Sequence, residues 1–454
     1  TSTEKSLEIT RPEIYYGEKT DNYVIVNTKE QEFDYPKGDA NVYSTYQGTG
    51  GVKVGSLLGK MLFAIKFNDL KILLTGYIDG QSRVMFNRNI LERARAVAPF
   101  LAYDSDPYMV IDQGKLFWVL DAYTLSNKYP YSDPAGSGYT QYNYIRNSVK
   151  IVIDAYNGTM DFYIADSTDP IIKTYQKIFP TLFKPIAAMR EGIKKHLRYP
   201  YDLFMIQANK YSAYHMQDPQ VFYNQEDLWN IPKENYAGAE QPMEAYYSIM
   251  RLPNEKREEF LLMLPFTPNN KSNMISWMAA RCDEKEYGKL IVYKFPKKKL
   301  IYGPMQIEAR IDQETEISKQ LSLWGQKGSR VLRGNLLAIP IEQSLIYVEP
   351  LYLEASEGEL PELKRVIVSY NDKIAMEESL EEALQSVFSG KVSTSAAPET
   401  AAQKETFNVK KLAGQALQLY DQALGSLKSG NWNGFGESIH NLGAKLRDLE
   451  SKAN

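Results

Sequence analysis

Three aspartates gather around the sequence DSDPY and could together hold a hard cation. Asp104 and Asp106 lie two residues apart in this loop, and Asp112 follows the next apolar run. Carboxylates spaced in this way can share a calcium ion, which takes about 6–8 oxygen ligands. The EF-hand spacing is absent, and an Asx-type turn closed by Pro107 explains the same residues. Two interpretations follow: a divalent-cation site at Asp104, Asp106 and Asp112, or a structural turn.

The other ionisable residues can be assigned either a structural role or a chemical one. Asp121, Asp154 and Asp169 stand at predicted strand ends or helix starts. Carboxylates there can serve as general acids or bases, but they more often cap helices and turns. His196 and His215 are 19 residues apart, unlike the i, i+4 pair of a zinc protease. We expect each imidazole to bond backbone at a helix end.

The remaining candidates give no catalytic signature. Cys282 is the single cysteine, which excludes a disulfide within the chain and any multi-cysteine metal site. Arg146, Arg198 and Arg310 could bind an anion, but we favour pairing with buried carboxylates that stabilise the structure. The glycine-rich run at 48–55 lacks the GK[ST] that a phosphate loop requires. Because GxSxG, HExxH and dinucleotide motifs are also absent, the sequence predicts no cofactor and argues against an enzyme.

Composition narrows the function classes. The 454 residues are 43% hydrophobic and 24% charged, with a net charge of −3, so the basic footprint of a nucleic-acid-binding protein is missing. The 33 tyrosines outnumber the 17 phenylalanines, and a ring with a polar tip suits half-buried sheet and loop positions or a binding surface. No apolar run approaches the roughly 20 residues of a membrane span. The chain starts at Thr1 in a polar stretch, which is typical of a cut at a domain boundary.

Apolar periodicity predicts an α+β fold, mainly antiparallel sheet with helical insertions. Further strands are predicted from residue 244 onward and again from residue 329. The predicted hairpins cover 107–123 and 148–165. The predicted helices cover 56–67, 88–101, 169–179, 199–216, 304–324 and 376–388.

The C-terminal residues differ in composition from the main body. We predict a main body over 1–389, with a subdomain boundary near 235–245. The small, polar stretch 390–405 is typical of a flexible linker. Residues 406–454 have two apolar stripes at helical spacing, which predict a helical hairpin. So small a hairpin cannot bury its stripes alone, so it must dock on the main body, on another chain or on a membrane-associated partner, and it could assemble oligomers.

Long stretches of the chain resemble uncharacterised protein family 0182, a family of large bacterial membrane proteins. The resemblance covers almost the whole chain and includes RPEIYYGE at 11–18, RNILERARAVAPFLAYDSDPY at 88–108, WVLDAYTLSNKYPYS at 118–132 and SLIYVEPLYLEA at 344–355. It implies membrane-spanning helices ahead of a large region outside the cytoplasmic membrane. This chain would be that region, on the extracytoplasmic side of the cell membrane and attached through spans that it does not contain. The resemblance supplies no catalytic residues.

These observations favour a binding or interaction module of the cell envelope, with an envelope protein or polymer as its partner. One alternative is a metal-assisted envelope hydrolase that uses the DSDPY loop. Another is an oligomeric assembly scaffold that uses residues 406–454. A binding module should show a Tyr-lined groove or an exposed apolar patch, whereas an enzyme should show a deep pocket that collects carboxylates, histidines or a metal.

Overall fold

The computed structural model describes residues 8–389 except 39, 137–140, 254, 284, 297–299, 326–328, 342–343 and 356–359. The predicted linker and helical hairpin lie outside the described residues. The chain divides into two compact units: unit 1 is Thr1–Asp312 with Asn335–Ser344, and unit 2 is Gln313–Gly334 with the residues from Leu345 onward. The boundary predicted near 235–245 lies inside unit 1 and stays a prediction about smaller subdomains.

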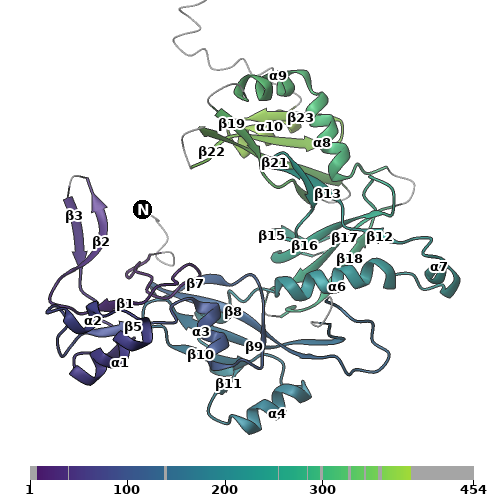
Figure 1. Cartoon of the computed structure of the whole chain (residues 1–454). Coiled ribbons are helices and arrows are strands. Elements are labelled where there is room, and N and C mark those ends of the chain that lie inside the picture. Colours follow the sequence, from purple (N-terminus) through teal and green to yellow (C-terminus); the bar gives the residue numbers. More distant parts are fainter. Residues whose placement is uncertain are drawn as a thin grey trace, which may run out of the picture. The chain divides into compact units, whose positions relative to one another are not determined.

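Unit 1 begins with a small sheet, a projecting hairpin and two helices (Figure 1). The sheet has the order β1-β5-β4, and β2 pairs only with β3. Ser56 caps helix α1 by accepting a hydrogen bond from the Gly59 amide, as the 56–67 helix prediction requires. The elements are β1 Val24–Val26, β2 Glu32–Lys37, β3 Ala40–Ser44, β4 Val52–Lys53, α1 Leu57–Phe67, α2 Lys71–Leu74 and β5 Arg83–Met85.

A six-stranded sheet follows, with the order β11-β10-β9-β8-β6 and with β7 also pairing β8. Both predicted hairpins are present, as β7–β8 and β9–β10, and they join because β8 pairs β9. Gln113 and Gly114 turn the first hairpin with φ of 51° and 74°, the left-handed backbone of a tight two-residue turn. The strands are β6 Ala102–Tyr103, β7 Tyr108–Asp112, β8 Lys115–Ser126, β9 Tyr144–Asp154, β10 Met160–Ile164 and β11 Phe183–Pro185.

Helices α3 (Ile90–Val97) and α4 (Pro170–Ile178) share a hydrophobic core with this sheet. Asp169 caps α4 as predicted: its carboxylate accepts hydrogen bonds from the Ile171 and Ile172 amides. The same carboxylate accepts bonds from the buried Thr124 and Ser148 hydroxyls, so the helix start is fixed to strands β8 and β9. A short helical segment, Ile186–Ala188, and α5 (Glu191–Lys194) follow.

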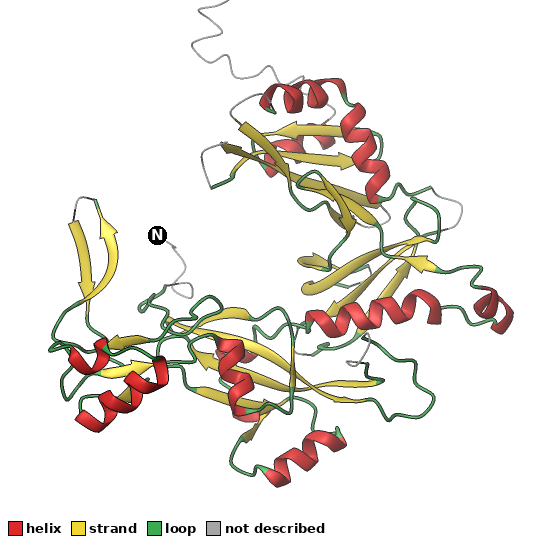
Figure 2. Cartoon of the chain, in the orientation of Figure 1, coloured by secondary structure: helices red, strands yellow, loops and turns green. Residues whose placement is uncertain are grey.

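The second large sheet of unit 1 has the order β12-β16-β17-β18, with β15 also on β16. Helix α6 contacts β12 and β16 (Figures 1 and 2), and Phe204, Trp229 and Leu264 are buried in the core between them. Tyr123 of β8 enters the same core, which links the two large sheets. The elements are α6 Tyr201–Tyr214, α7 Pro219–Asn224, β12 Trp229–Asn230, β13 Lys233–Tyr236, β14 Ala239–Pro242, β15 Tyr246–Arg251, β16 Glu258–Pro268, β17 Ser276–Arg281, β18 Leu290–Lys294, α8 Pro304–Gln313 and β20 Leu337–Ile341.

Unit 2 contains an antiparallel sheet with the order β19-β21-β22-β23, against which α10 packs. Arg333 and Glu349 form a buried ion pair across β19 and β21. The elements are α9 Thr315–Trp324, β19 Ser329–Arg333, β21 Ser344–Ala355, β22 Glu362–Tyr370, β23 Lys373–Glu377 and α10 Leu380–Ser389.

The α+β class, with mainly antiparallel sheets, is confirmed. Two predicted helix boundaries are wrong. The 304–324 helix breaks at Glu314, whose extended backbone (ψ 116°) separates α8 from α9. The 376–388 helix starts only at Leu380, because residues 373–377 pair with β22. Within the described part of the chain, no helix is long and apolar enough to cross a bilayer.

A buried ion pair joins the centres of β8 and β9. Asp121 lies opposite Lys150 in the strand register, and the Lys150 amine contacts the Asp121 carboxylate. Their side chains are only 3% and 1% exposed. Burial alone would lower the pKa of Lys150, but the Asp121 charge and the hydrogen bond to Asp121 act in the opposite direction, so the pKa is raised and the amine stays protonated.

Replacing Lys150 with Met should destabilise the chain by about 3–5 kcal/mol, because the Asp121 carboxylate would be left buried without its counter-charge. The double variant Lys150→Met/Asp121→Leu should be more stable than the single variant, because it removes both buried charges. Urea unfolding monitored by tryptophan fluorescence measures both. A double variant less stable than Lys150→Met alone would contradict this account of the pair.

Candidate functional site

The DSDPY loop caps the start of helix α6. Pro200 occupies the N-cap position and has no side-chain oxygen to accept a bond from the first helical amides. The Asp104 carboxylate takes that role from 98 residues away, accepting a 3.0 Å bond from the Asp202 amide. Asp202 reciprocates: its carboxylate accepts bonds from the Ser105 amide (2.8 Å) and the Ser105 hydroxyl (2.7 Å). The loop and the helix are thereby held in one position.

Asp104 is buried at this junction, with 2% of its surface exposed. Its carboxylate accepts further bonds from the Asp106 amide and the Tyr123 hydroxyl. Burial raises the pKa of Asp104 to about 6, and the nearby charge of Asp202 adds to the rise, against the opposing effect of the Tyr123 bond. Burial, followed by the Asp104 charge, also raises the pKa of Tyr123 well above its usual value.

The chain that leads into α6 is held by its backbone. The Arg198 amide donates a 2.9 Å bond to the Tyr108 hydroxyl. The Arg198 carbonyl accepts bonds from the Lys150 amine (3.2 Å) and the Tyr287 hydroxyl (3.0 Å). Strands β7 and β9 and the loop after β17 therefore meet at the backbone of one residue, Arg198.

The backbone of the next residue, Tyr199, is bonded in the same manner by side chains from the region of the second sheet. The Tyr199 amide donates to the Cys282 sulfur at 3.3 Å, and the Tyr199 carbonyl accepts a 2.9 Å bond from the Tyr247 hydroxyl. The Arg198 guanidinium lies over the Tyr108 and Tyr247 rings, 4.6 Å and 5.0 Å from their centroids, a cation–π arrangement. We call the backbone amides and carbonyls of Arg198 and Tyr199, with these partners, the peptide clamp.

A pocket of about 310 Å³ opens beside the capped end of α6. Three tyrosines and a group of aliphatic side chains line it, with the Asp202 carboxylate as its single charge. The lining residues are Ala102, Tyr103, Tyr123, Leu125, Tyr142, Ile145, Asp202, Met205, Ile206 and Asn209. They come from β6, β8, the start of β9 and one side of α6, together with Tyr142 just before β9. Apolar walls with a few placed polar groups are the usual form of a ligand pocket. We call this the tyrosine pocket.

The polar groups of the tyrosine pocket differ in whether they can still form hydrogen bonds with a ligand. The Tyr103 hydroxyl donates toward the Ala94 and Ala98 carbonyls, at 2.9 Å and 2.7 Å, so the ring rather than the hydroxyl is available. Each Asp202 carboxylate oxygen accepts one bond from Ser105, and each has a further lone pair. The pocket can therefore accept hydrogen bonds from a donor-bearing or cationic group beside an apolar one.

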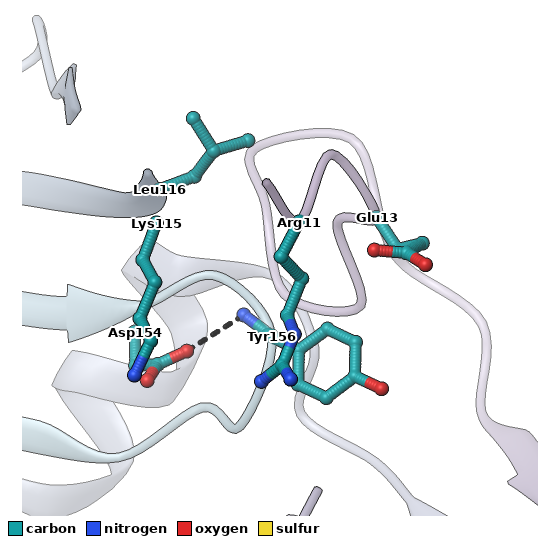
Figure 3. Close-up of a pocket in the computed structure, with 6 residues that line it drawn as sticks. All are labelled: Arg11, Glu13, Lys115, Leu116, Asp154 and Tyr156. Atoms are coloured by element: carbon teal, nitrogen blue, oxygen red, sulfur yellow. Dashed lines mark hydrogen bonds between the residues drawn. The ribbon is translucent and has the colours of Figure 1, made fainter. Parts of the chain in front are cut away.

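A second pocket is charged but small. Figure 3 shows Arg11, Glu13, Lys115 and Asp154 around it, with the Arg11 guanidinium against the Tyr156 ring. Its volume is about 10 Å³, which admits at most one water molecule. The Asp154 carboxylate bonds the Tyr156 amide at 2.9 Å, so Asp154 closes a turn, as predicted. This pocket is too small to serve as a ligand site.

The structure places the three predicted metal ligands in two groups. Asp104 and Asp106 share the loop, and both Asp104 oxygens already accept hydrogen bonds. Asp112 lies at the other end of β7, where its carboxylate pairs with Arg190 at 3.2 Å. Among the described residues, no group of three or more His, Cys, Asp or Glu side chains could hold a metal ion. The divalent-cation site stays a prediction.

The histidines behave as expected. His196 Nδ1 lies 2.7 Å from the Gly192 carbonyl, and His215 Nδ1 lies 3.1 Å from the Tyr211 carbonyl. His215 also stacks on Trp229, with ring centroids 3.7 Å apart. Cys282 is buried, and burial raises the pKa of its thiol to about 11, so at neutral pH it is not the thiolate that nucleophilic catalysis needs.

The arginines take two different roles. Arg146 pairs with Asp166 at 2.8 Å, and both side chains are partly exposed, 48% and 25%. Arg198 stacks on aromatic rings in the peptide clamp. Arg310 lies 4.8 Å from the centroid of the Tyr302 ring. Arg146 therefore pairs with a carboxylate, but not with a buried one as predicted, and Arg198 contacts aromatic rings.

Sequence reasoning did not find the tyrosine pocket or the capping role of Asp104. A signal for the cap was present, because RYPYDLF places Pro at the N-cap of a predicted helix and leaves the first amides without a local acceptor. The pocket had no such signal, since its lining comes from four separate segments. Asp121 was expected to cap a strand end or turn but forms the buried pair with Lys150.

Comparisons with known proteins agree with the resemblance seen in the sequence. A model of the uncharacterised protein family UPF0182 matches residues 1–324. Three similar relatives, each named UPF0182 protein, come from Desulforamulus reducens (54% identical), Pelotomaculum thermopropionicum (53%) and Methanospirillum hungatei (51%). The matches cover 99%, 98% and 96% of this chain and 49% of each relative, so the chain spans about half the length of these curated relatives. No solved structure matches the chain.

The raised pKa of Asp104 predicts a pH dependence of stability. A buried carboxyl that prefers to stay protonated contributes stability below its unfolded pKa, near 4, and this contribution is lost as pH rises through about 6. Asp104→Asn cannot ionise. As pH rises from 4 to 7, the free energy of unfolding of Asp104→Asn should therefore increase by about 2–3 kcal/mol relative to that of the original chain.

Urea unfolding at a series of pH values measures this difference. The matched control is Asp161→Asn, which removes a half-exposed carboxylate paired with Lys184 and should change the pH profile little. Parallel profiles for Asp104→Asn and the original chain would show that Asp104 titrates normally.

Proposed function

The chain belongs to the uncharacterised protein family UPF0182, and from this premise we propose that it is a binding module of the cell envelope. In this proposal it forms the extracytoplasmic region of a bacterial integral membrane protein, attached through spans elsewhere in the parent protein. The observation that carries the binding role is the tyrosine pocket, an open recess with aromatic and aliphatic walls on a rigid support. The names of the relatives assign no function.

The chemistry of the tyrosine pocket favours a peptide segment of an envelope protein as the ligand. Leu125, Ile145 and Met205 offer apolar contact, while Asp202 supplies the one carboxylate. Such a lining suits an apolar side chain next to a lysine or arginine, because the cation would meet the carboxylate and the apolar group would leave water. An envelope polymer with hydroxyl or amino groups is the second occupant that the lining admits.

The pocket favours binding over hydrolysis for a physical reason. A hydrolase needs a positioned acid, base or metal beside its substrate. The Asp202 carboxylate already holds Ser105 at the junction with the loop, and His196 and His215 are absent from the lining. Oligomer assembly through residues 406–454 concerns a segment outside the described residues and remains the alternative that oligomer measurements address.

Site-specific photo-crosslinking from Tyr142 tests the proposal in living cells that express the full-length parent protein. With benzoylphenylalanine at this position, we expect a crosslink to one envelope protein. Asp202→Asn should weaken the crosslink about tenfold, because a charge-assisted contact contributes about 1.5–3 kcal/mol. Glu18→Gln, the same chemical change at an exposed position, should leave it unchanged.

Three results would count against the proposal in different ways. A crosslink to a polysaccharide would replace the peptide ligand with a polymer. A crosslink to a cytoplasmic protein would overturn the envelope location. An absent crosslink, or one insensitive to Asp202→Asn, would remove the tyrosine pocket as the binding site.

A further inference from the structure

Helix α1 carries an apolar stripe on its outer surface. The exposed residues follow the spacing i, i+1, i+4, i+5 and i+8, which places them within less than half a turn of the helix. They are Leu57 (70% exposed), Leu58 (66%), Met61 (45%), Leu62 (58%) and Ile65 (73%). A helix that covers only its own unit would present polar side chains here.

The inner face of α1 is also apolar and is already occupied. Ala64 is buried, and Phe63 and Phe67 pack against a core that includes Val54 and Ile78. The outer stripe therefore is not needed to hold α1 on unit 1. A helix with apolar residues on every side is usually buried on every side.

Helix α2 extends the stripe. It contacts α1, and Figure 1 shows the two helices together at the start of unit 1. Leu70 and Leu74 are 69% and 80% exposed, while Ile72 between them is buried. Exposed apolar side chains gathered on two contacting helices favour an interaction surface over chance exposure of single residues. We call these outer residues of α1 and α2 the α1–α2 face.

Positive charge borders the α1–α2 face. Lys53, Lys66 and Lys71 are exposed, and the single acidic residue from 53 to 74 is Asp69. The Asp69 carboxylate is already bonded by the Tyr23 hydroxyl at 2.6 Å and by the Lys71 amide at 2.9 Å. A second copy of this face would bring like charges together, whereas anionic lipid headgroups would be attracted to them.

We propose that the α1–α2 face docks on an anionic phospholipid bilayer, with its leucine and isoleucine side chains among the upper acyl chains and its lysines among the headgroups. The inference rests on the proposed position beside a membrane but not on the ligand of the tyrosine pocket. It assigns a second contact with the bilayer, distinct from any span in the parent protein.

Co-sedimentation of the purified 454-residue chain with sucrose-loaded vesicles tests this inference. The chain should bind phosphatidylcholine vesicles that contain phosphatidylglycerol, and binding should weaken with salt. The triple variant Leu58→Gln/Leu62→Gln/Ile65→Gln should lower the partition coefficient at least about tenfold, because three apolar side chains lose their burial. Lys66→Gln/Lys71→Gln should weaken binding to the anionic vesicles about fivefold or more and leave weak binding to pure phosphatidylcholine unchanged.

The matched control replaces three exposed apolar residues elsewhere, Ile249→Gln/Leu323→Gln/Leu360→Gln, whose side chains are 72%, 60% and 85% exposed. This control should bind vesicles as the original chain does. No sedimentation with anionic vesicles, or equal sedimentation of the α1 triple variant, overturns the inference. A dimer that the α1 triple variant converts to monomer would assign the face to a second copy instead.

The two proposals fail separately. Asp202→Asn should keep full vesicle binding, since Asp202 lies in the tyrosine pocket and at its junction with the DSDPY loop, and is not part of the α1–α2 face. Loss of vesicle binding in the original chain would leave the crosslinking result from Tyr142 intact, so the envelope binding role would stand without the bilayer contact.

Discussion

Two successive residues, Arg198 and Tyr199, connect the large sheets of unit 1 through their backbone groups. Each has its amide and its carbonyl bonded by side chains: Tyr108 and Lys150 come from the first sheet, and Tyr247 comes from the second. A buried backbone group without a partner costs about as much as a lost hydrogen bond or more. The clamp therefore tolerates one arrangement of its partners, and that arrangement sets where helix α6 begins.

The clamp also fixes one of the elements that line the tyrosine pocket. One wall is the side of α6, and the others come from strands of the first sheet. Asp104 completes the support because it caps α6 from the loop between β6 and β7. A pocket whose walls are already fixed loses less conformational entropy when a ligand binds. This supports a role in recognition. The α1–α2 face differs, because its exposed side chains lie outside the core of their own unit.

Local sequence rules predicted the parts of the fold that depend on neighbouring residues. Asp169 followed by Pro170 marked a helix start, and the DQG turn marked a hairpin, because both signals act within a few residues. The break at Glu314 was missed since the apolar spacing continues across it. The pairing of Asp121 with Lys150 depends on strand register, and the cap from Asp104 joins residues 98 positions apart. Such contacts become visible only when the whole sheet is assembled.

Amide hydrogen exchange of the 454-residue chain, compared between the original and Tyr247→Phe, tests the clamp most directly. The variant removes the bond to the Tyr199 carbonyl and keeps the ring. We expect exchange to become about tenfold faster together at the start of α6 and in the 104–106 loop, since loss of one buried hydrogen bond costs about 1–3 kcal/mol. Exchange in α4 should stay unchanged. Unchanged exchange at α6, or faster exchange there without the loop, would contradict a clamp that positions both the start of α6 and the DSDPY loop.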